Sequence, residues 1–284
     1  MRTDLHCHST ASDGIHSPRQ LVALARRRAI DVIALTDHDT IAGHAEAQAA
    51  GREHGVRVIP GIECSALGGQ GETHVLGYGV EPTDEATRNT LLGLRETRVS
   101  RARKILARLA QSGIGIDFAR VQKLAGDGMI GRPHIARAMM EVQAVTSIQE
   151  AFDVFLGEGK PAFVANDALD PAQAIDLIHR ARGVAVLAHP GLMRGNVDVL
   201  LAEMIAHGLD GIEVYYPDHD AAQRTHYASI AAAHGLIVTG GSDYHGLTPE
   251  AVHEFGEIAL PAGCIEALDA RIAWRRANRD RSAG

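Results

Sequence analysis

The chain has 284 residues, of which 45% are hydrophobic and 22% charged, and its formal net charge is -7. This composition is ordinary for a globular protein and excludes the intrinsically disordered and fibrous classes. The negative charge argues against a protein that coats nucleic acid with a broad basic surface, but it leaves room for a local basic pocket that holds a short nucleotide.

The cysteines and the N-terminus indicate a reducing compartment. Cys7, Cys64 and Cys264 form no C-x-x-C pair and cannot all pair with one another, so we expect no disulfide framework. The N-terminus has no apolar signal core, and no run approaches eighteen apolar residues, so neither export nor a membrane span is expected. We therefore expect a cytoplasmic protein without an obligate protein partner.

Short runs rich in Val and Ile alternate with longer amphipathic stretches along most of the chain. The runs predict strands at 3–8, 32–38, 56–65, 73–80, 184–190, 211–217 and 237–245. The stretches between them predict helices at 18–28, 41–54, 171–182, 197–207 and 221–234. Ser17-Pro18 and Asp170-Pro171 place a capping residue before a proline at the first helical position, which is typical of a helix start.

This alternation predicts an α/β fold with a parallel sheet. Seven strands favour a distorted (β/α)7 TIM-like barrel, one unit short of the eightfold form. An open doubly wound sheet is the alternative, but its G-x-G-x-x-G turn is absent. Residues 85–164 break the alternation and predict a small helical insertion with an apolar stripe, so the barrel comprises 1–84 and 165–284. The stripe consists of Leu91, Leu92, Leu94, Val99, Ile105, Leu106 and Leu109.

Side chains that bind metals occur at nearly every predicted strand end. His6 and His8 are two apart on one strand, so they lie on the same face and can hold one ion. In α/β barrels the C-terminal strand ends build the active site, and randomly scattered histidines would not gather there. The other candidates are Asp13, His38, Glu63, His74, His134, His189, Asp243 and His245.

Taken together, the motifs around these residues resemble those of the polymerase and histidinol phosphatase (PHP) family. The motifs are D-L-H-x-H-S, T-D-H-D, G-x-E, the lone His74, G-R-P-H, A-H-P and S-D-x-H. The resemblance runs in order from Thr3 to His245. It implies three metal sites that share some ligands. They are His6, His8, Glu63 and Asp243 for the first, Glu63, His74 and His134 for the second, and Asp13, His38 and His245 for the third.

Imidazole and carboxylate ligands together suit Mn, Fe or Zn. We expect two to three divalent ions, with Mn²⁺ favoured over Fe²⁺ or Zn²⁺. Cys7 should face away from His6 and His8 by strand alternation. Asp37 and Asp39 flank His38, and one of them could orient its imidazole. Asp39 could equally cap a helix.

Several residues are candidates for contact with a phosphate substrate. Arg132 could hold two phosphate oxygens through its planar fork. His189 could neutralise charge or protonate the leaving oxygen, while Tyr216 and His219 could line the substrate pocket. Arg95, Arg98 and Arg101 share a helical face, and a solvated face is favoured there over contact with phosphate or RNA.

Within the family, the overall pattern is most similar to phosphoesterases that act on nucleoside 3′,5′-bisphosphates and to a 5′-3′ exoribonuclease. We therefore expect removal of the 3′-phosphate from a compound such as adenosine 3′,5′-bisphosphate, by in-line attack of a hydroxide that bridges metal ions. The alternatives are 5′-3′ cleavage of short 5′-phosphorylated RNA, histidinol-phosphate hydrolysis, an amidohydrolase, and a non-catalytic accessory module.

Overall fold

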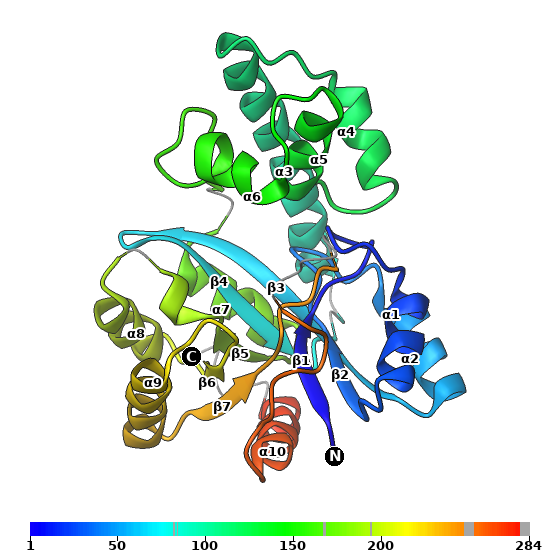
Figure 1. The fold of residues 1–284 in the computed structure, drawn as a ribbon. Coiled ribbons are helices and arrows are strands. Elements are labelled where there is room, and N and C mark those ends of the chain that lie inside the picture. The colour runs from blue at the N-terminus through cyan, green and yellow to red at the C-terminus, as the bar shows by residue number, and fades with distance from the viewer. Residues whose placement is uncertain (82, 84, 167–168, 194, 247–252, 279–284) are drawn as a thin grey trace.

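The computed structural model describes residues 1–81, 83, 85–166, 169–193, 195–246 and 253–278. In these residues one curled seven-stranded sheet follows the chain order from β1 to β7 (Figure 1). Beyond β7, Tyr244 returns to the first strand, because the His8 N–H donates to the Tyr244 carbonyl oxygen over 2.9 Å. The strands are β1 (Thr3–Cys7), β2 (Val32–Leu35), β3 (Arg57–Gly68), β4 (Gly71–Tyr78), β5 (Val184–Leu187), β6 (Gly211–Tyr215) and β7 (Ile237–Gly240).

The mixed α/β class is confirmed, but β4 interrupts the regular β/α repeat. β4 pairs antiparallel with both β3 and β5, whereas the other neighbouring strands pair parallel. Gly68 faces Gly71 across a tight turn, so no crossover helix can lie between β3 and β4. Gly71 has a φ of 103°, which a residue with a side chain rarely adopts. The sheet is therefore a half-barrel rather than an all-parallel barrel.

The helices that flank the sheet match the predicted ones closely. Ser17 and Asp170 each form a capping box with the glutamine three residues later. An additional C-terminal helix, α10 (Cys264–Ala277), was not predicted, and it packs Ile265, Leu268 and Ile272 into the core of the half-barrel. The predicted helices are α1 (Pro18–Arg27), α2 (His44–His54), α7 (Pro171–Arg180), α8 (Val197–Ala206) and α9 (Ala221–His234).

The segment between β4 and α7 is helical and lies over one end of the sheet, opposite α10 (Figure 1). It has a hydrophobic core of its own, which includes Ile105, Leu109 and Met139. The predicted apolar stripe is wrong at Leu92, which is 65% exposed. The elements are α3 (Glu85–Gln111), α4 (Phe118–Ala125), α5 (Arg132–Glu141), α6 (Ile148–Ala151) and a single π-helical turn (Phe152–Leu156).

Residue 84, the predicted end of the first barrel segment, lies outside the described residues, so the division at 84 and 164 stays a prediction. Among the described helices, none has the length and apolar character needed to cross a membrane.

Candidate metal centre

Histidine and carboxylate side chains from separate strands converge below the helical segment. Eight of the nine predicted ligands fall into three groups, and within each group the ligand atoms lie within 4.8 Å of one another. His8, His38 and Glu63 each belong to two groups. The groups are His6, His8, Glu63 and Asp243; His38, Glu63 and His74; and His8, Asp13, His38 and His245.

Strand geometry explains how the side chains reach this position. His6 and His8 flank Cys7, whose side chain is directed to the opposite face, where its Sγ lies 3.1 Å from the Ala34 carbonyl oxygen. The expectation for Cys7 is therefore confirmed. His74 belongs to the first half of β4 and pairs with Ser65, two residues beyond Glu63. Because β4 runs antiparallel, its first half lies at the edge where the parallel strands end.

Three residues that follow parallel strands at this edge have a backbone conformation with positive φ. Asp39, His189 and Asp243 have φ values of 54°, 26° and 54°. Such a conformation costs on the order of 1–3 kcal/mol in a residue other than glycine, and it concentrates at functional sites. The surrounding structure therefore holds these turns in place against their local preference.

The donor atoms of the cluster fit divalent cations. Buried polar atoms without a hydrogen-bond partner are costly and uncommon in folded proteins. The His8 Nε2 lies 3.0 Å from an Asp243 oxygen and 3.3 Å from a Glu63 oxygen, yet these atoms make no hydrogen bond. A cation between them would satisfy all of them together. The unpartnered atoms at this site are His6 Nε2, both ring nitrogens of His8, Asp13 Oδ1, His38 Nδ1, Glu63 Oε2 and Asp243 Oδ1.

The carboxylates of the cluster remain ionised although they are buried. Burial raises the pKa of Glu63, but the imidazoles of His38, His74 and His6 hold it well below its usual range. Burial lowers the pKa of His8, whereas the neighbouring carboxylates of Asp243 and Glu63 more than offset this and raise it to about 10. The site thus concentrates negative charge that a bound cation would neutralise.

Glu213 in β6 supports the cluster from behind. This fully buried carboxylate accepts from the His6 Nδ1 at 3.0 Å and from the His189 backbone N–H at 2.8 Å. A carboxylate on the far nitrogen of a metal-binding histidine fixes its tautomer and orientation. Sequence reasoning missed Glu213, although an acidic residue within the apolar run Gly211–Tyr215 was a usable signal.

Asp37 and Asp39 do not play the roles expected for them. Asp37 accepts from the Ser9 N–H and the Ser12 hydroxyl, both at 2.7 Å, and so holds the loop that carries Asp13. Asp39 accepts from the Ser65 N–H at 2.8 Å. The N-cap of α2 is Gly43, so neither aspartate caps that helix. The hydrogen bonds of Asp37 and Asp39 within the described chain go to residues other than His38.

The positions of His134 and His189 differ from those implied by the resemblance. The Nε2 of His189 lies 3.1 Å from Glu63 Oε1 and 3.3 Å from His74 Nδ1. His134 joins none of the three groups in the described chain, and its Nδ1 accepts the Gly131 N–H at 3.0 Å. Burial lowers the pKa of His134 to about 4. The structure therefore brings His189, rather than His134, to Glu63 and His74.

Arginines form one wall of the cavity above the cluster. Arg98 and Arg101 are only 6% and 8% exposed, so the expectation of a solvated helix face is wrong for both, and of the three only Arg95 is exposed. Arg98 donates to Asp39 at 2.6 Å and to the Ser65 hydroxyl at 2.8 Å. Arg101 and Arg132 contact the two oxygens of Glu72 at 2.5 Å and 3.2 Å. The cavity has a volume of about 450 Å³, and its lining contains Asp13, His38, His74, Asp243 and His245 together with Arg98, Arg101 and Arg132.

Tyr216 and His219 lie behind the cluster. Tyr216 is 3% exposed, and its hydroxyl donates to Asp243 at 3.2 Å. The Nδ1 of His219 donates to the Val214 carbonyl oxygen at 2.9 Å, and its Nε2 accepts the Gly191 N–H at 3.0 Å. His219 therefore has no free N–H for a phosphate. The two side chains contact Asp243 and the turn after β5, and neither is among the residues that line the cavity above the cluster. Their contact with substrate stays a prediction.

A curled α/β sheet with a buried cluster of imidazoles and carboxylates defines a metal-dependent hydrolase. Residues 4–182 match the model of the PHP domain, and the chain belongs to this family. It is 36% identical to the 3′,5′-nucleoside bisphosphate phosphatase of Chromobacterium violaceum, over 85% of this chain and 86% of the relative. It is also 38% identical to a 5′-3′ exoribonuclease of Haemophilus influenzae, over 85% of this chain and 89% of the relative.

A solved structure agrees with this assignment. The crystal structure of a protein from Bifidobacterium adolescentis, described as a metal-dependent phosphoesterase, superposes with a TM-score of 0.87 at 32% identity. The alignment covers 95% of this chain and 96% of that one. The protein is thus a PHP-family phosphoesterase whose chemistry depends on divalent metal ions.

Proposed function

We propose that the protein removes the 3′-phosphate from nucleoside 3′,5′-bisphosphates. The observation that carries this proposal is the pairing, within one cavity, of the metal-ligand groups with the guanidinium groups of Arg98, Arg101 and Arg132. A substrate with two phosphates places one at the ligand groups and the other at the arginines. A volume of about 450 Å³ is within the range of small-molecule sites.

Three sets of residues would hold two to three cations, with Mn²⁺ favoured by the mixed nitrogen and oxygen donors. Bound divalent ions lower the pKa of water and stabilise charge on phosphoryl oxygens. His189 enters the second set in place of His134, so its proposed role changes from proton donor to ligand. The sets are His6, His8, Glu63 and Asp243; Glu63, His74 and His189; and Asp13, His38 and His245.

The arginine wall would recognise the phosphate that is not cleaved. Among the described residues, the three guanidinium groups form ion pairs with two carboxylates, Asp39 and Glu72, so one more positive charge than negative charge takes part in these pairs. These carboxylates hold the planar groups in fixed orientations, which favours bidentate binding of phosphate. Phe152, in the π-helical turn, and the half-exposed Leu192 line the same cavity and offer apolar surface to a nucleobase.

The proposal is tested by a phosphate-release screen in Mn²⁺. The substrates are nucleoside 2′-, 3′- and 5′-monophosphates, 3′,5′-bisphosphates and histidinol phosphate. We expect kcat/KM for the bisphosphates to exceed that for the 3′-monophosphates by about a hundredfold, because charge-assisted bonds to a second phosphate contribute on the order of 3 kcal/mol. Preference for histidinol phosphate, or no preference among nucleotides, would overturn the proposal.

A variant shows whether the arginine wall causes this preference. In Arg132→Ala we expect kcat/KM for the bisphosphate to fall about tenfold or more, with little change for the 3′-monophosphate, which has no second phosphate. Arg120→Ala is the matched control, because Arg120 pairs with Glu141 on the surface of the helical segment, away from the cavity. An equal loss on both substrates in Arg132→Ala would contradict the role of Arg132.

A further inference from the structure

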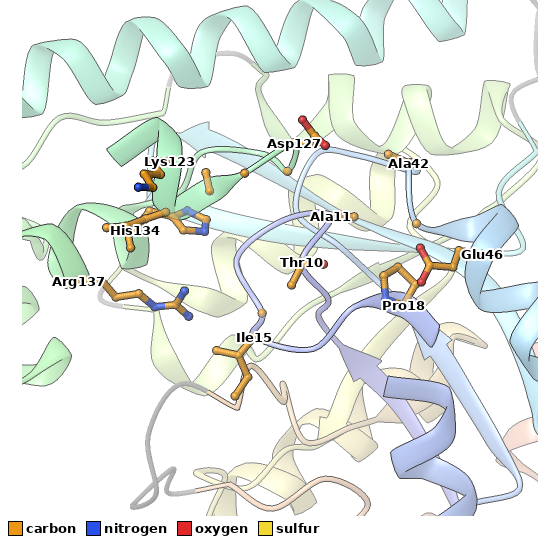
Figure 2. A pocket seen from close by; sticks show the side chains of 16 residues that line it. Thr10, Ala11, Ile15, Pro18, Ala42, Glu46, Lys123, Asp127, His134 and Arg137 are labelled. Atoms are coloured by element: carbon orange, nitrogen blue, oxygen red, sulfur yellow. The ribbon is translucent and has the colours of Figure 1, made fainter. Parts of the chain in front are cut away.

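A second cavity, of about 570 Å³, lies between the loop that follows β1 and the α4–α5 part of the helical segment (Figure 2). None of its lining residues also lines the cavity above the metal-ligand groups. Lys123, His134 and Arg137 form one end, and Glu46 lies across the cavity from them (Figure 2). Neither the metal groups nor the arginine wall uses these residues.

The Lys123 end of this cavity presents nitrogen donors. The Nη2 of Arg137 is buried and makes no hydrogen bond within the described part of the chain. His134 is 2% exposed, and because its Nδ1 accepts the Gly131 N–H, its proton is on Nε2. The Lys123 side chain is exposed and adds a further positive charge. Two cations and a neutral N–H donor at one end of a cavity form a site suited to phosphate.

The cavity shares a rigid wall with the metal-ligand groups. The Met129 N–H donates to the Ala11 carbonyl oxygen at 2.8 Å, which ties the α4–α5 connection to the loop after β1. Gly128 has no room for a side chain, since a Cβ would lie 2.2 Å from the Thr10 carbonyl oxygen. A Cβ at Gly131 would likewise lie 2.9 Å from the carboxylate of Asp13. Asp13 therefore lies next to this wall, between the two cavities.

We propose that this second cavity binds a phosphate of an RNA strand beyond the bond that is cleaved. The inference rests on the proposed function. A 3′,5′-bisphosphate has two phosphates, which the metal-ligand groups and the arginine wall already accommodate. A third phosphate site has an occupant only when the substrate is an oligonucleotide. The first substrate long enough is a 5′-phosphorylated trinucleotide, whose second internucleotide phosphate lies one nucleotide beyond the bond that is cleaved.

The same bond breaks in both kinds of substrate. The oxygen of water forms a new bond to phosphorus, and the bond between phosphorus and the 3′ oxygen of the first nucleotide breaks. That 3′ oxygen is the leaving group and gains a proton, and the phosphate remains with the other product. From a bisphosphate this other product is inorganic phosphate, whereas from RNA it is a shortened strand with a new 5′-phosphate. One site can therefore act stepwise on short RNA in the 5′-to-3′ direction.

The test compares kcat/KM for a 3′,5′-bisphosphate, a 5′-phosphorylated dinucleotide and a 5′-phosphorylated trinucleotide. In the unmodified protein we expect the trinucleotide to exceed the dinucleotide by about tenfold. Lys123→Ala and Arg137→Ala should each remove most of that gain and leave the bisphosphate within about twofold. Lys104→Ala is the matched control, because Lys104 is exposed on α3 and lines neither cavity.

Equal kcat/KM for dinucleotide and trinucleotide in the unmodified protein would overturn the inference. So would an equal loss on all three substrates in the exposed Lys123→Ala variant when its melting temperature is unchanged. Failure of the proposed function has a different signature, namely no phosphate release from the bisphosphate by the unmodified protein. Cleavage of the trinucleotide without that activity would keep the second cavity and discard the phosphatase.

Discussion

Two buried carboxylates, Asp210 and Glu63, show how the two ends of the half-barrel differ. Asp210 precedes β6, at the end covered by α10, and each of its oxygens has hydrogen-bond partners. Its oxygens accept from the Ala185 N–H at 3.0 Å, from His179 at 3.0 Å, and from Arg271 and Arg275 at 3.0 Å and 2.8 Å. Glu63 lies at the opposite end, where its Oε2 has no hydrogen-bond partner although ring nitrogens of His6, His8 and His38 lie 3.4, 3.3 and 3.0 Å away.

Both carboxyl groups have lowered pKa values despite burial, but for different reasons. For Asp210 the cause is the bond to His179 together with Arg275, whose positive charge is permanent. For Glu63 the cause is the surrounding imidazoles, whose charge depends on a proton that a metal ion can displace. A buried acid therefore does not by itself mark a functional site. A buried acid marks a functional site when one of its oxygens lacks a fixed hydrogen-bond partner. In TIM-like folds such acids occur at the C-terminal ends of the strands.

The largest expected effect in this comparison comes from Glu63→Gln. The amide keeps the shape of the side chain but removes the charge shared by two ligand groups. We expect turnover to fall by about a thousandfold or more, because metal-assisted hydrolysis requires the cations to be held. Metal content, measured by elemental analysis of the purified protein, should fall in parallel. Asp269→Asn, which removes a carboxylate paired with Arg57 at the surface, is the control and should retain both properties. Full activity in Glu63→Gln would refute the metal centre.

A smaller loss is expected for Glu213→Gln, because Glu213 acts through His6 and the His189 backbone and does not belong to a ligand group. Loss of such an orienting carboxylate typically weakens metal affinity by about 10–100-fold. Added Mn²⁺ should therefore restore much of the activity, which it should not do in Glu63→Gln. A manganese titration of activity measures this difference. Unchanged manganese dependence would show that Glu213 is only a packing residue. Glu254→Gln, at an exposed position, is the control.

The sequence predicts which residues gather at the strand ends better than it predicts which of them share a metal ion. His6, His8 and Glu63 follow from side-chain alternation and from the rule that strand ends meet at one edge. The direction of β4 could not be read, because an apolar run has the same pattern in either direction. Arg98 and Arg101 were expected in solvent, since a helical face does not reveal which neighbour covers it. His134 and His189 differed from expectation because the placement of a turn depends on tertiary contacts.

The opposite end of the half-barrel should respond in stability rather than in activity. The pKa of Asp210 is lowered to about 2 from 3.8, mainly by His179 and Arg275 against the effect of burial. The ionised carboxylate then contributes about 2 kcal/mol to the free energy of unfolding. This contribution is fully present above the unfolded-state pKa of 3.8 and is lost as the pH falls towards 2.

Asp210→Asn should therefore lower the free energy of unfolding by about 2 kcal/mol at pH 7, and the deficit should shrink to about half at pH 3. Denaturant unfolding of both proteins at the two pH values measures the change, and phosphate release per metal-loaded molecule at pH 7 should stay the same. A deficit that does not change with pH would mean that packing, not charge, holds this end together. A loss of activity without a loss of stability would contradict the comparison itself. In that comparison the end with Asp210, whose oxygens all have partners, stabilises the fold, and the end with Glu63 binds cations.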